Sequence, residues 1–280
     1  MIPGGKTFDL ISDVHLDFYV SNTNVHRLEW RINRFVKGIL PDDPSSTLVI
    51  AGDLGHYNKQ NALMLGVLKE YYHHIIFVRG NHDLYLISNS QKALYQNSSQ
   101  LRWLHMKDLA AEIPSVYVLE GQTLQIDGIT FGGTGMWYDY SYGIQVLKKK
   151  FKWIHEVWRT RMNDINYITE TPDFQQEWEL LDPIIDKSDV IVTHMGPDWS
   201  QLPLKHQEDI IQSFYFFDGA AWLPRLHGKT WCFGHCHPYY GAYEKDGCTF
   251  VNNALGYPYE RKKAKIIKVW LNDMCYGGAE

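Results

Sequence analysis

The chain has 280 residues, of which 45% are hydrophobic and 21% charged, a composition typical of a soluble globular protein. Its formal net charge of −5 and its pI near 6.2 argue against a protein that coats nucleic acid or an anionic membrane surface. No stretch has the length and apolarity of a membrane span, and the first residues lack the apolar run of a secretory signal. We therefore expect a cytoplasmic protein that does not bind a membrane.

Short runs rich in β-branched and aromatic residues predict strands along the chain. The predicted strands are residues 7–11, 47–50, 74–78, 116–119, 124–131, 190–193, 230–233 and 264–271. Helical patterns at 25–40 and 61–72 alternate with the first strands, which is typical of an α/β sheet with mostly parallel order. Residues 241–250 indicate a hairpin with an Asp246-Gly247 turn, so the second half of the chain looks more antiparallel. A mixed architecture with two sheets follows.

Residues 140–186 form a predicted helical insertion in what we expect to be a single domain spanning residues 1–280. The helix pattern places Leu147, Phe151, Ile154 and Trp158 opposite Lys148, Lys149, Lys152 and Arg159. One interpretation is a surface helix with a solvated basic face; the other is a flap that helps hold an anionic substrate. The four cysteines are too sparse for a disulfide framework, and Cys232 and Cys236 are expected to be packing thiols rather than half of a zinc site.

Five predicted strands end in polar side chains that can bind a metal ion or a proton. In chain order these residues are Asp13 and His15, Asp53, Asn81 and His82, His194, and His235 and His237. The carboxyl ends of strands in an open α/β sheet border the crevice in which ligands bind. We therefore expect these side chains to converge.

Carboxylate, amide and imidazole ligands suit divalent Mn, Fe or Zn, and the set is too large for one tetrahedral zinc ion. Two ions fit the count, with the carboxylate of Asp53 as the bridge and Asn81 giving a carbonyl oxygen. Residues i and i+2 of an extended segment point the same way, which explains the Asp-X-His and His-X-His spacings. Gly52, Gly80 and Gly234 allow tight turns and close backbone approach just before the ligands.

Together these motifs resemble the pattern of the calcineurin-like metallophosphoesterases: Asp-X-His, Gly-Asp, Gly-Asn-His-Asp, a solitary His and Gly-His-X-His. The similarity spans Asp13 to His237, and the segments 133–139 and 253–258 also resemble stretches near the site in single-domain bacterial and phage members. The resemblance implies a four-layer α/β/β/α sandwich of two mixed sheets and a dinuclear centre. Carried over by motif, one ion is held by Asp13, His15, Asp53 and His237, and the other by Asp53, Asn81, His194 and His235.

The function expected from this site is hydrolysis of a phosphomonoester or phosphodiester, small or nucleotide-like, by a hydroxide that bridges the two ions. His82 is free of metal in this scheme and is expected to protonate the leaving group; the alternative is a hydrogen bond to the substrate. The second Asp and the Arg of the phosphoprotein phosphatase motif Gly-Asp-X-X-Asp-Arg-Gly are missing after Asp53. Instead His56 follows, as in the exonuclease subunit of double-strand-break repair complexes, whose catalytic histidine pair corresponds to His56 and His82.

A nuclease acting on DNA or RNA is therefore the second hypothesis, not favoured because of the net negative charge, and an inactive interaction scaffold is the third. Trp137, Tyr138 and Trp199 are candidates for a wall that binds substrate, or else for core packing. The basic run 261–263 borders the cleft in one interpretation and is a solvated loop in the other.

Overall fold

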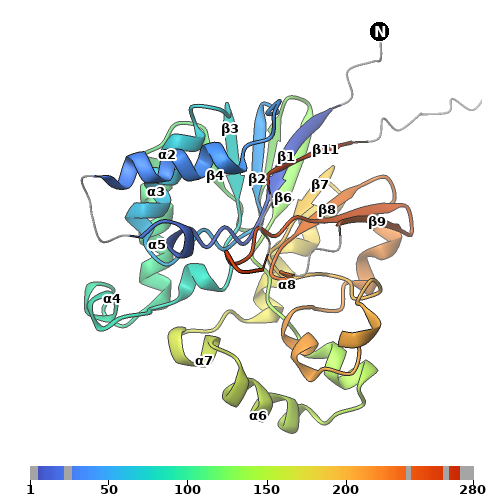
Figure 1. The fold of residues 1–280 in the computed structure, drawn as a ribbon. Coiled ribbons are helices and arrows are strands. Elements are labelled where there is room, and N and C mark those ends of the chain that lie inside the picture. Colours follow the sequence, from blue (N-terminus) through green and yellow to red (C-terminus); the bar gives the residue numbers. More distant parts are fainter. Residues whose placement is uncertain (1–5, 22–26, 238–240, 261–264, 272–280) are drawn as a thin grey trace, which may run out of the picture.

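The computed structural model of the protein describes residues 6–21, 27–237, 241–260 and 265–271. Two β-sheets lie face to face, and helices cover their outer sides (Figure 1). This confirms the predicted α/β/β/α order of two mixed sheets. Among the described residues no helix is long and apolar enough to cross a membrane.

The first sheet has the order β11-β1-β2-β3-β4 and is parallel except at β11. Its strands are β1 (Thr7–Ile11), β2 (Thr47–Ile50), β3 (His74–Phe77), β4 (Val116–Val118) and β11 (Ile267–Trp270). The register pairs Ile11 with Ile50, and Ile50 with Phe77, so the three central strands end level with one another. The polar residues that follow these strands are therefore brought to one edge of the sheet.

The second sheet has the order β5-β6-β7-β8-β10-β9. Its strands are β5 (Thr123–Ile126), β6 (Ile129–Gly133), β7 (Val190–Val192), β8 (Thr230–Phe233), β9 (Gly241–Lys245) and β10 (Cys248–Asn252). The hairpin of β9 and β10 is confirmed, with Asp246 and Gly247 both at positive φ. The antiparallel expectation for the second half also holds for β11, which pairs with β1. It was wrong for β7, β8 and β10, because β6, β7, β8 and β10 are parallel neighbours.

The predicted single strand at 124–131 was also wrong, because Asp127 and Gly128 break it into the hairpin of β5 and β6. Both residues adopt positive φ, 50° at Asp127 and 75° at Gly128, as a tight hairpin turn requires. Apolar residues on both sides of this pair hid the turn in the sequence.

Alternate residues of the strands face either the other sheet or the outer helices. Phe8 and Leu10 of β1 pack between the sheets, and the ring of Phe8 meets that of Phe131 edge to face at 5.5 Å. Ile50 and Phe77 belong to the larger core beneath the helices. Burial on both faces accounts for the nearly continuous apolar runs of these strands.

The helices are α1 (Leu16–Tyr19), α2 (Leu28–Ile39), α3 (Asn58–Leu68), α4 (Asn89–Leu94), α5 (Ser99–Ala111), α6 (Phe151–Arg161), α7 (Asp164–Tyr167) and α8 (Phe174–Ile185). Helices α2, α3 and α5 form the layer outside the first sheet, and α8 packs on β6 of the second. The expected helix at 61–72 thus begins and ends earlier, whereas part of the one expected at 25–40 lies outside the described residues.

The predicted helical insertion contains α6, α7 and α8, and α6 with α7 lies below the sandwich in the view of Figure 1. Ile154 and Trp158 of α6 are buried as the helix pattern predicts, but Phe151 is 54% exposed. Cys232 and Cys236 are buried free thiols within apolar clusters, as expected for packing residues.

Candidate metal centre

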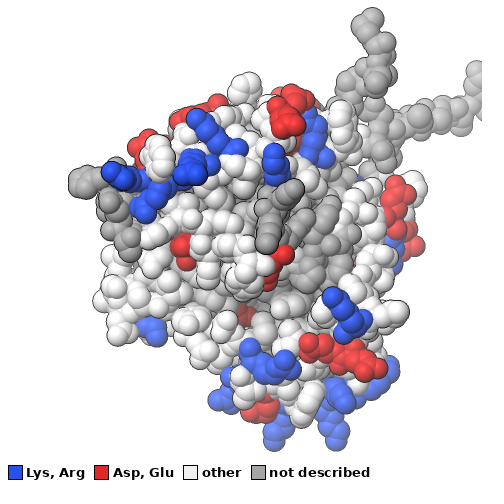
Figure 2. All heavy atoms as spheres, viewed as in Figure 1, with Lys and Arg blue, Asp and Glu red and all other residues white. Residues whose placement is uncertain are grey.

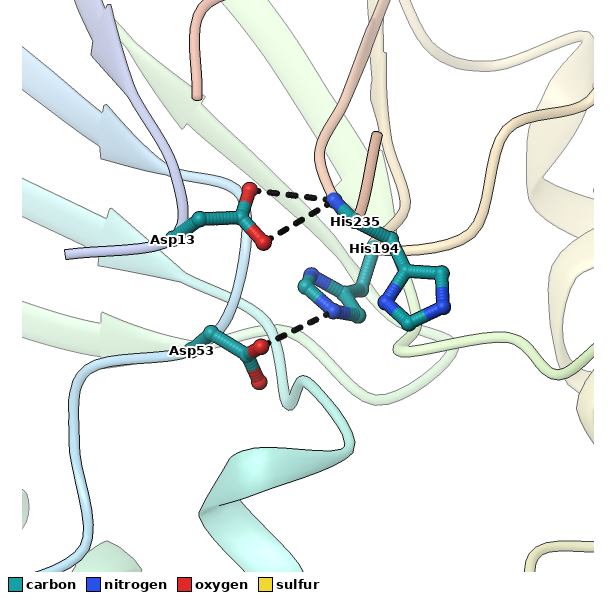
Figure 3. A group of neighbouring side chains, drawn as sticks. All are labelled: Asp13, Asp53, His194 and His235. Carbon is teal, nitrogen blue, oxygen red and sulfur yellow. Dashed lines mark hydrogen bonds and ion pairs between the residues drawn. The ribbon is translucent and has the colours of Figure 1, made fainter. Parts of the chain in front are cut away.

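The polar residues that end the central strands meet at one place between the two sheets. Side-chain atoms lie within 4.8 Å of one another in three overlapping groups: Asp13, Asp53, His194 and His235; Asp13, His15 and His237; and His15, Asp53 and His82. In Figure 3 the carboxylates of Asp13 and Asp53, which follow strands of the first sheet, point toward the imidazoles of His194 and His235, which follow strands of the second. The convergence of these side chains is thus a consequence of the level strand ends.

The backbone at this cluster is strained. Asp13, His15, Asp53 and His235 all have φ between 44° and 64°, the left-handed region that residues with a Cβ rarely adopt. Such conformations cost about 1–3 kcal/mol each and gather at functional sites, where the surrounding structure enforces them. Their concentration in four of the converging residues supports a functional role for the cluster independently of residue type.

One candidate cation position lies among Asp13, His15 and His237. The Nε2 atom of His237 is 3.3 Å from Oδ1 of Asp13 and 3.0 Å from Nε2 of His15. The Nδ1–H group of His237 donates to Glu260 at 2.8 Å, which turns the Nε2 lone pair toward the cluster. Burial lowers the pKa of His15 to about 4, so its imidazole is neutral at physiological pH. Two ring nitrogens facing each other at this distance require a proton or a cation between them.

The second candidate position lies among Asp53, Asn81, His194 and His235. Nδ1 of His194 contacts the carbonyl oxygen of Ala51 at 2.8 Å and must be its donor, because a carbonyl oxygen only accepts. Nε2 of His194 then faces two oxygens, Oδ1 of Asn81 at 3.1 Å and Oδ2 of Asp53 at 3.4 Å.

Nε2 of His235 likewise donates to a backbone carbonyl, that of Phe214, at 3.1 Å. Burial lowers the pKa of His235 to about 3, so the neutral ring keeps a lone pair on Nδ1. Burial also lowers the pKa of His194, but the charge of Asp53 outweighs it and raises the value to about 9. His194 is therefore protonated at neutral pH, and the proton on its Nε2 lies where a cation bound by His194 and Asp53 would lie.

Asp53 lies between the two positions. Its Oδ1 accepts the backbone N–H of His82 at 2.8 Å. Its Oδ2 is buried and accepts no hydrogen bond from the described residues, although Nε2 of His194 lies 3.4 Å away and Nε2 of His15 3.8 Å away. A buried carboxylate oxygen held only by such long contacts is costly, and divalent cations would satisfy it better. The residues present therefore fit divalent cations, and Asp53 belongs to two of the three groups that could hold one.

His82 lies at the end of a hydrogen-bonded chain. Nδ1 of His56 donates to Asp17 at 2.8 Å, and Nε2 of His56 lies 2.9 Å from Nδ1 of His82. With Nε2 of His56 as the acceptor, His82 donates from Nδ1 and its own Nε2 stays free of this chain. Arg102, fully buried, donates to the carbonyl oxygens of His82 and Gly55, each at 2.7 Å, and so fixes both loops.

Several residues that hold the cluster were missed from the sequence. Asp83 is buried and accepts the backbone N–H groups of Gly80, Asp53 and Leu54 at 2.8, 3.0 and 3.1 Å, which shapes the loop of the bridging carboxylate. Burial raises the pKa of Asp83 to about 6. Asp83 stands within Gly-Asn-His-Asp, so the motif itself was the signal for it, whereas no local pattern marked Glu260.

A cleft of about 520 Å³ opens above the cluster. The residues that line it include Asp53, His82 and Tyr257 and, from the insertion and the segment after β7, Arg161 and His206. Tyr257 lies in the segment 253–258, which the sequence resemblance placed near the site without giving Tyr257 a role, and its ring stacks on that of His15 at 4.7 Å. Lys and Arg side chains gather at the lower edge of the view in Figure 2, where Figure 1 has α6. The insertion therefore contributes both a basic face and one wall of the cleft.

The three aromatic residues expected at a substrate wall lie elsewhere. Trp137 and Tyr138 are 4% and 1% exposed and belong to the hydrophobic core. Trp199 packs edge to face against Tyr142 at 5.6 Å and borders a separate depression. None of the three is among the described residues that line the cleft, and the basic run 261–263 lies outside the described residues.

The chain is similar to known proteins both in sequence and in fold. The sequence profile of the calcineurin-like phosphoesterase family matches residues 6–239. The uncharacterized protein L509 of Acanthamoeba polyphaga mimivirus is 22% identical over 269 residues, covering 90% of this chain and 91% of that protein. The crystal structure of a phosphopantetheinyl hydrolase from Mycobacterium tuberculosis has a TM-score of 0.72 at 17% identity, covering 98% of this chain and 99% of the other. A dimetal phosphatase from Danio rerio has a TM-score of 0.49 at 14% identity, covering 95% and 93%.

Proposed function

The chain belongs to the calcineurin-like phosphoesterase family, and we propose that it hydrolyses a small phosphate ester with two divalent cations held between its sheets. The observation that carries the proposal is the buried Oδ2 of Asp53, which accepts no hydrogen bond from the described residues and has Nε2 of His194 at 3.4 Å and Nε2 of His15 at 3.8 Å. Asp13, His15, Asp53 and His237 would hold one ion, and Asp53, Asn81, His194 and His235 the other. The oxygen and imidazole set suits Mn, Fe or Zn.

The ions supply Lewis acidity and, from water, a nucleophile at neutral pH. The protein's own contribution is to hold the ligands in place before substrate arrives. The hydrogen bonds from His194 to Ala51 and from His237 to Glu260 fix which ring nitrogen carries the proton, so that the other nitrogen keeps its lone pair for a cation.

His82 is the residue we assign to proton transfer at the leaving group, acting from Nε2. Burial lowers the pKa of His82 well below its usual value, so the ring must gain its proton when an anionic substrate enters. The chain through His56 to Asp17 supports this role, because it orients the ring and stabilises the positive charge that the protonated form carries.

A phosphomonoester or phosphodiester of small size suits the cleft of about 520 Å³. The related structure from Mycobacterium tuberculosis is named a phosphopantetheinyl hydrolase, which supports a small ester as the substrate class.

A nuclease acting on DNA or RNA is the second candidate, favoured by the direct contact of His56 with His82 and by the basic face of α6. A nucleic-acid substrate would make binding fall steeply with salt concentration, because phosphate contacts release counterions. A small ester would show only a weak salt dependence.

The test combines metal analysis with a substrate screen. Metal-free protein is loaded with Mn, Fe or Zn, the bound ions are counted, and hydrolysis of an aryl phosphomonoester, a bis-aryl phosphodiester and an oligonucleotide is measured. We expect two ions per chain and turnover of a small ester, with both lost in Asp53→Asn. Two bound ions without hydrolysis of any of these three substrates would instead support the hypothesis of an inactive interaction scaffold.

A further inference from the structure

The side-chain amide of Asn81 is the one candidate ligand whose orientation is ambiguous by chemistry, because its oxygen and nitrogen ends have the same shape. Oδ1 lies 3.1 Å from Nε2 of His194, toward the second cation position. Nδ2 lies 2.9 Å from Oδ1 of Asp164 and 3.2 Å from the hydroxyl of Tyr85. A rotation of the amide by half a turn would aim the NH₂ group at the cation and remove a ligand.

We propose that Asp164, supplied by the insertion, is the positioning residue that keeps the oxygen of Asn81 facing the second ion. A carboxylate only accepts hydrogen bonds, so it binds the NH₂ end of Asn81 and rejects the oxygen end. Its negative charge also polarises the amide, which makes the oxygen of Asn81 a stronger ligand for a cation. This inference rests on the proposed function, since it assigns the second ion to Asn81.

Asp164 is itself held rigidly. It is 0% exposed, and its Oδ1 and Oδ2 accept the hydroxyl groups of Tyr85 at 2.6 Å and of Tyr138 at 2.8 Å. The indole N–H of Trp158 in α6 in turn donates to the hydroxyl of Tyr138. With both carboxylate oxygens engaged, Asp164 cannot rotate to offer Asn81 a different geometry.

A purely structural role accounts poorly for an acidic residue at this position. None of the ion pairs between described residues includes Asp164, so its charge is buried without a Lys or Arg partner. Burying a carboxylate without a cation is expensive, and a neutral acceptor would satisfy the two tyrosines at lower cost. A divalent ion held by the oxygen of Asn81 would supply the missing positive charge.

The location of Asp164 gives the insertion a function. Asp164 is the first residue of α7, and the backbone N–H of Leu86 donates to the carbonyl of Tyr167 at 2.8 Å, which docks α7 beside the loop of Asn81. The helices α6 and α7 thus complete the second metal position from outside the sandwich, in addition to lining the cleft.

The test measures metal affinity of the full chain rather than turnover. Metal-free wild type, Asp164→Asn and the control Glu156→Gln are titrated with Mn or Zn by calorimetry, and folding is checked by circular dichroism. Glu156 is an exposed acid of α6 that pairs with Arg159 and lies outside the metal cluster. We expect Asp164→Asn to weaken one of the two ions about 10- to 100-fold, the usual effect of losing such a partner, and Glu156→Gln to match wild type.

A double-mutant cycle separates positioning from general damage. In an Asn81→Ala background, Asp164→Asn should cause no further loss, because the amide on which it acts is gone. Two ions bound with wild-type affinity in folded Asp164→Asn, or an equal loss in the Asn81→Ala background, would overturn the proposal. If Asp164→Asn does not fold, Tyr138→Phe is measured in its place and should weaken the binding of the same ion. Wild-type metal affinity in Tyr138→Phe would then overturn the proposal. A wild type that binds no metal would instead refute the proposed function.

Discussion

Gly80, which precedes Asn81, offers the most direct test of how closely the loops of the site approach one another. A Cβ atom at Gly80 would lie 2.1 Å from Oδ1 of Asp53 and 2.5 Å from its backbone nitrogen. Ordinary contact begins at 3.4 Å, so Asp53 would have to move by more than an ångström. The φ angle of Gly80 is not in the left-handed region, and the obstacle to Gly80→Ala is therefore space alone.

The size of the effect follows from what Asp53 has to do. Overpacking of this kind costs about 1–3 kcal/mol of folding free energy, because a backbone atom cannot swing aside. Metal ligands must be placed to within about 0.2 Å, so a shift of the proposed bridge abolishes at least one ion site. Gly80→Ala should thus lower the free energy of unfolding and reduce the bound metal below two ions per chain.

The assay is chemical unfolding with and without metal, together with metal counting. Gly66 in α3 provides the matched control, because no described atom beyond its chain neighbours and the backbone of its own helix lies within 4 Å of a Cβ built there. Gly66→Ala should keep both ions and gain about 0.5–1 kcal/mol of stability from helix propensity. Wild-type stability and two ions in Gly80→Ala would refute the close approach on which this reasoning depends.

Two further predictions concern proton transfer and metal binding. His82→Ala should keep both ions but lose about 10²- to 10⁴-fold in turnover of an ester with a poor leaving group, and much less with a good one; an equal loss with both would argue against a proton donor. Burial lowers the pKa of His237, but Asp13 and Glu260 outweigh it and raise the value to about 10. Burial also lowers the pKa of His194, but Asp53 raises that value to about 9. A cation must displace these protons, so metal affinity should rise with pH and metal binding at pH 7 should release protons. Calorimetry in buffers of different ionisation enthalpy measures the number of protons released. Metal binding without proton release would contradict these pKa values.

The converging residues were predictable because they follow strands, and strand ends have a simple geometry. Runs such as residues 47–50 and 230–233 match β2 and β8 residue for residue. The level register then carries Asp53 and its neighbours to one edge without further information. The close approach expected at Gly52, Gly80 and Gly234 is also confirmed, since a Cβ at each would lie within 3 Å of another loop.

Two of the supporting residues, Glu260 and Asp164, were not predictable, because no local sequence pattern specifies them. Glu260 reaches His237 across 23 residues of chain, and Asp164 reaches Asn81 across 83. The choice between substrate binding and core packing for Trp137 and Tyr138 was open for a related reason: an aromatic ring next to a site motif fits the core and a cleft equally well. Only the packing of α6 favours the core.

The distribution of buried charge gives a reason for cations that does not depend on any motif. Asp13, Asp53, Asp83 and Asp164 are all fully or almost fully buried around one point. Arg102 is the only Lys or Arg side chain that is buried to the same degree among the described residues. Carboxylates in a low-dielectric interior require positive charge nearby, and without it they take up protons or unfold the site. Protonated histidines supply part of the positive charge, and two divalent ions would supply the rest. Bonds from the ligands to these ions would also stabilise the strained backbone of the loops.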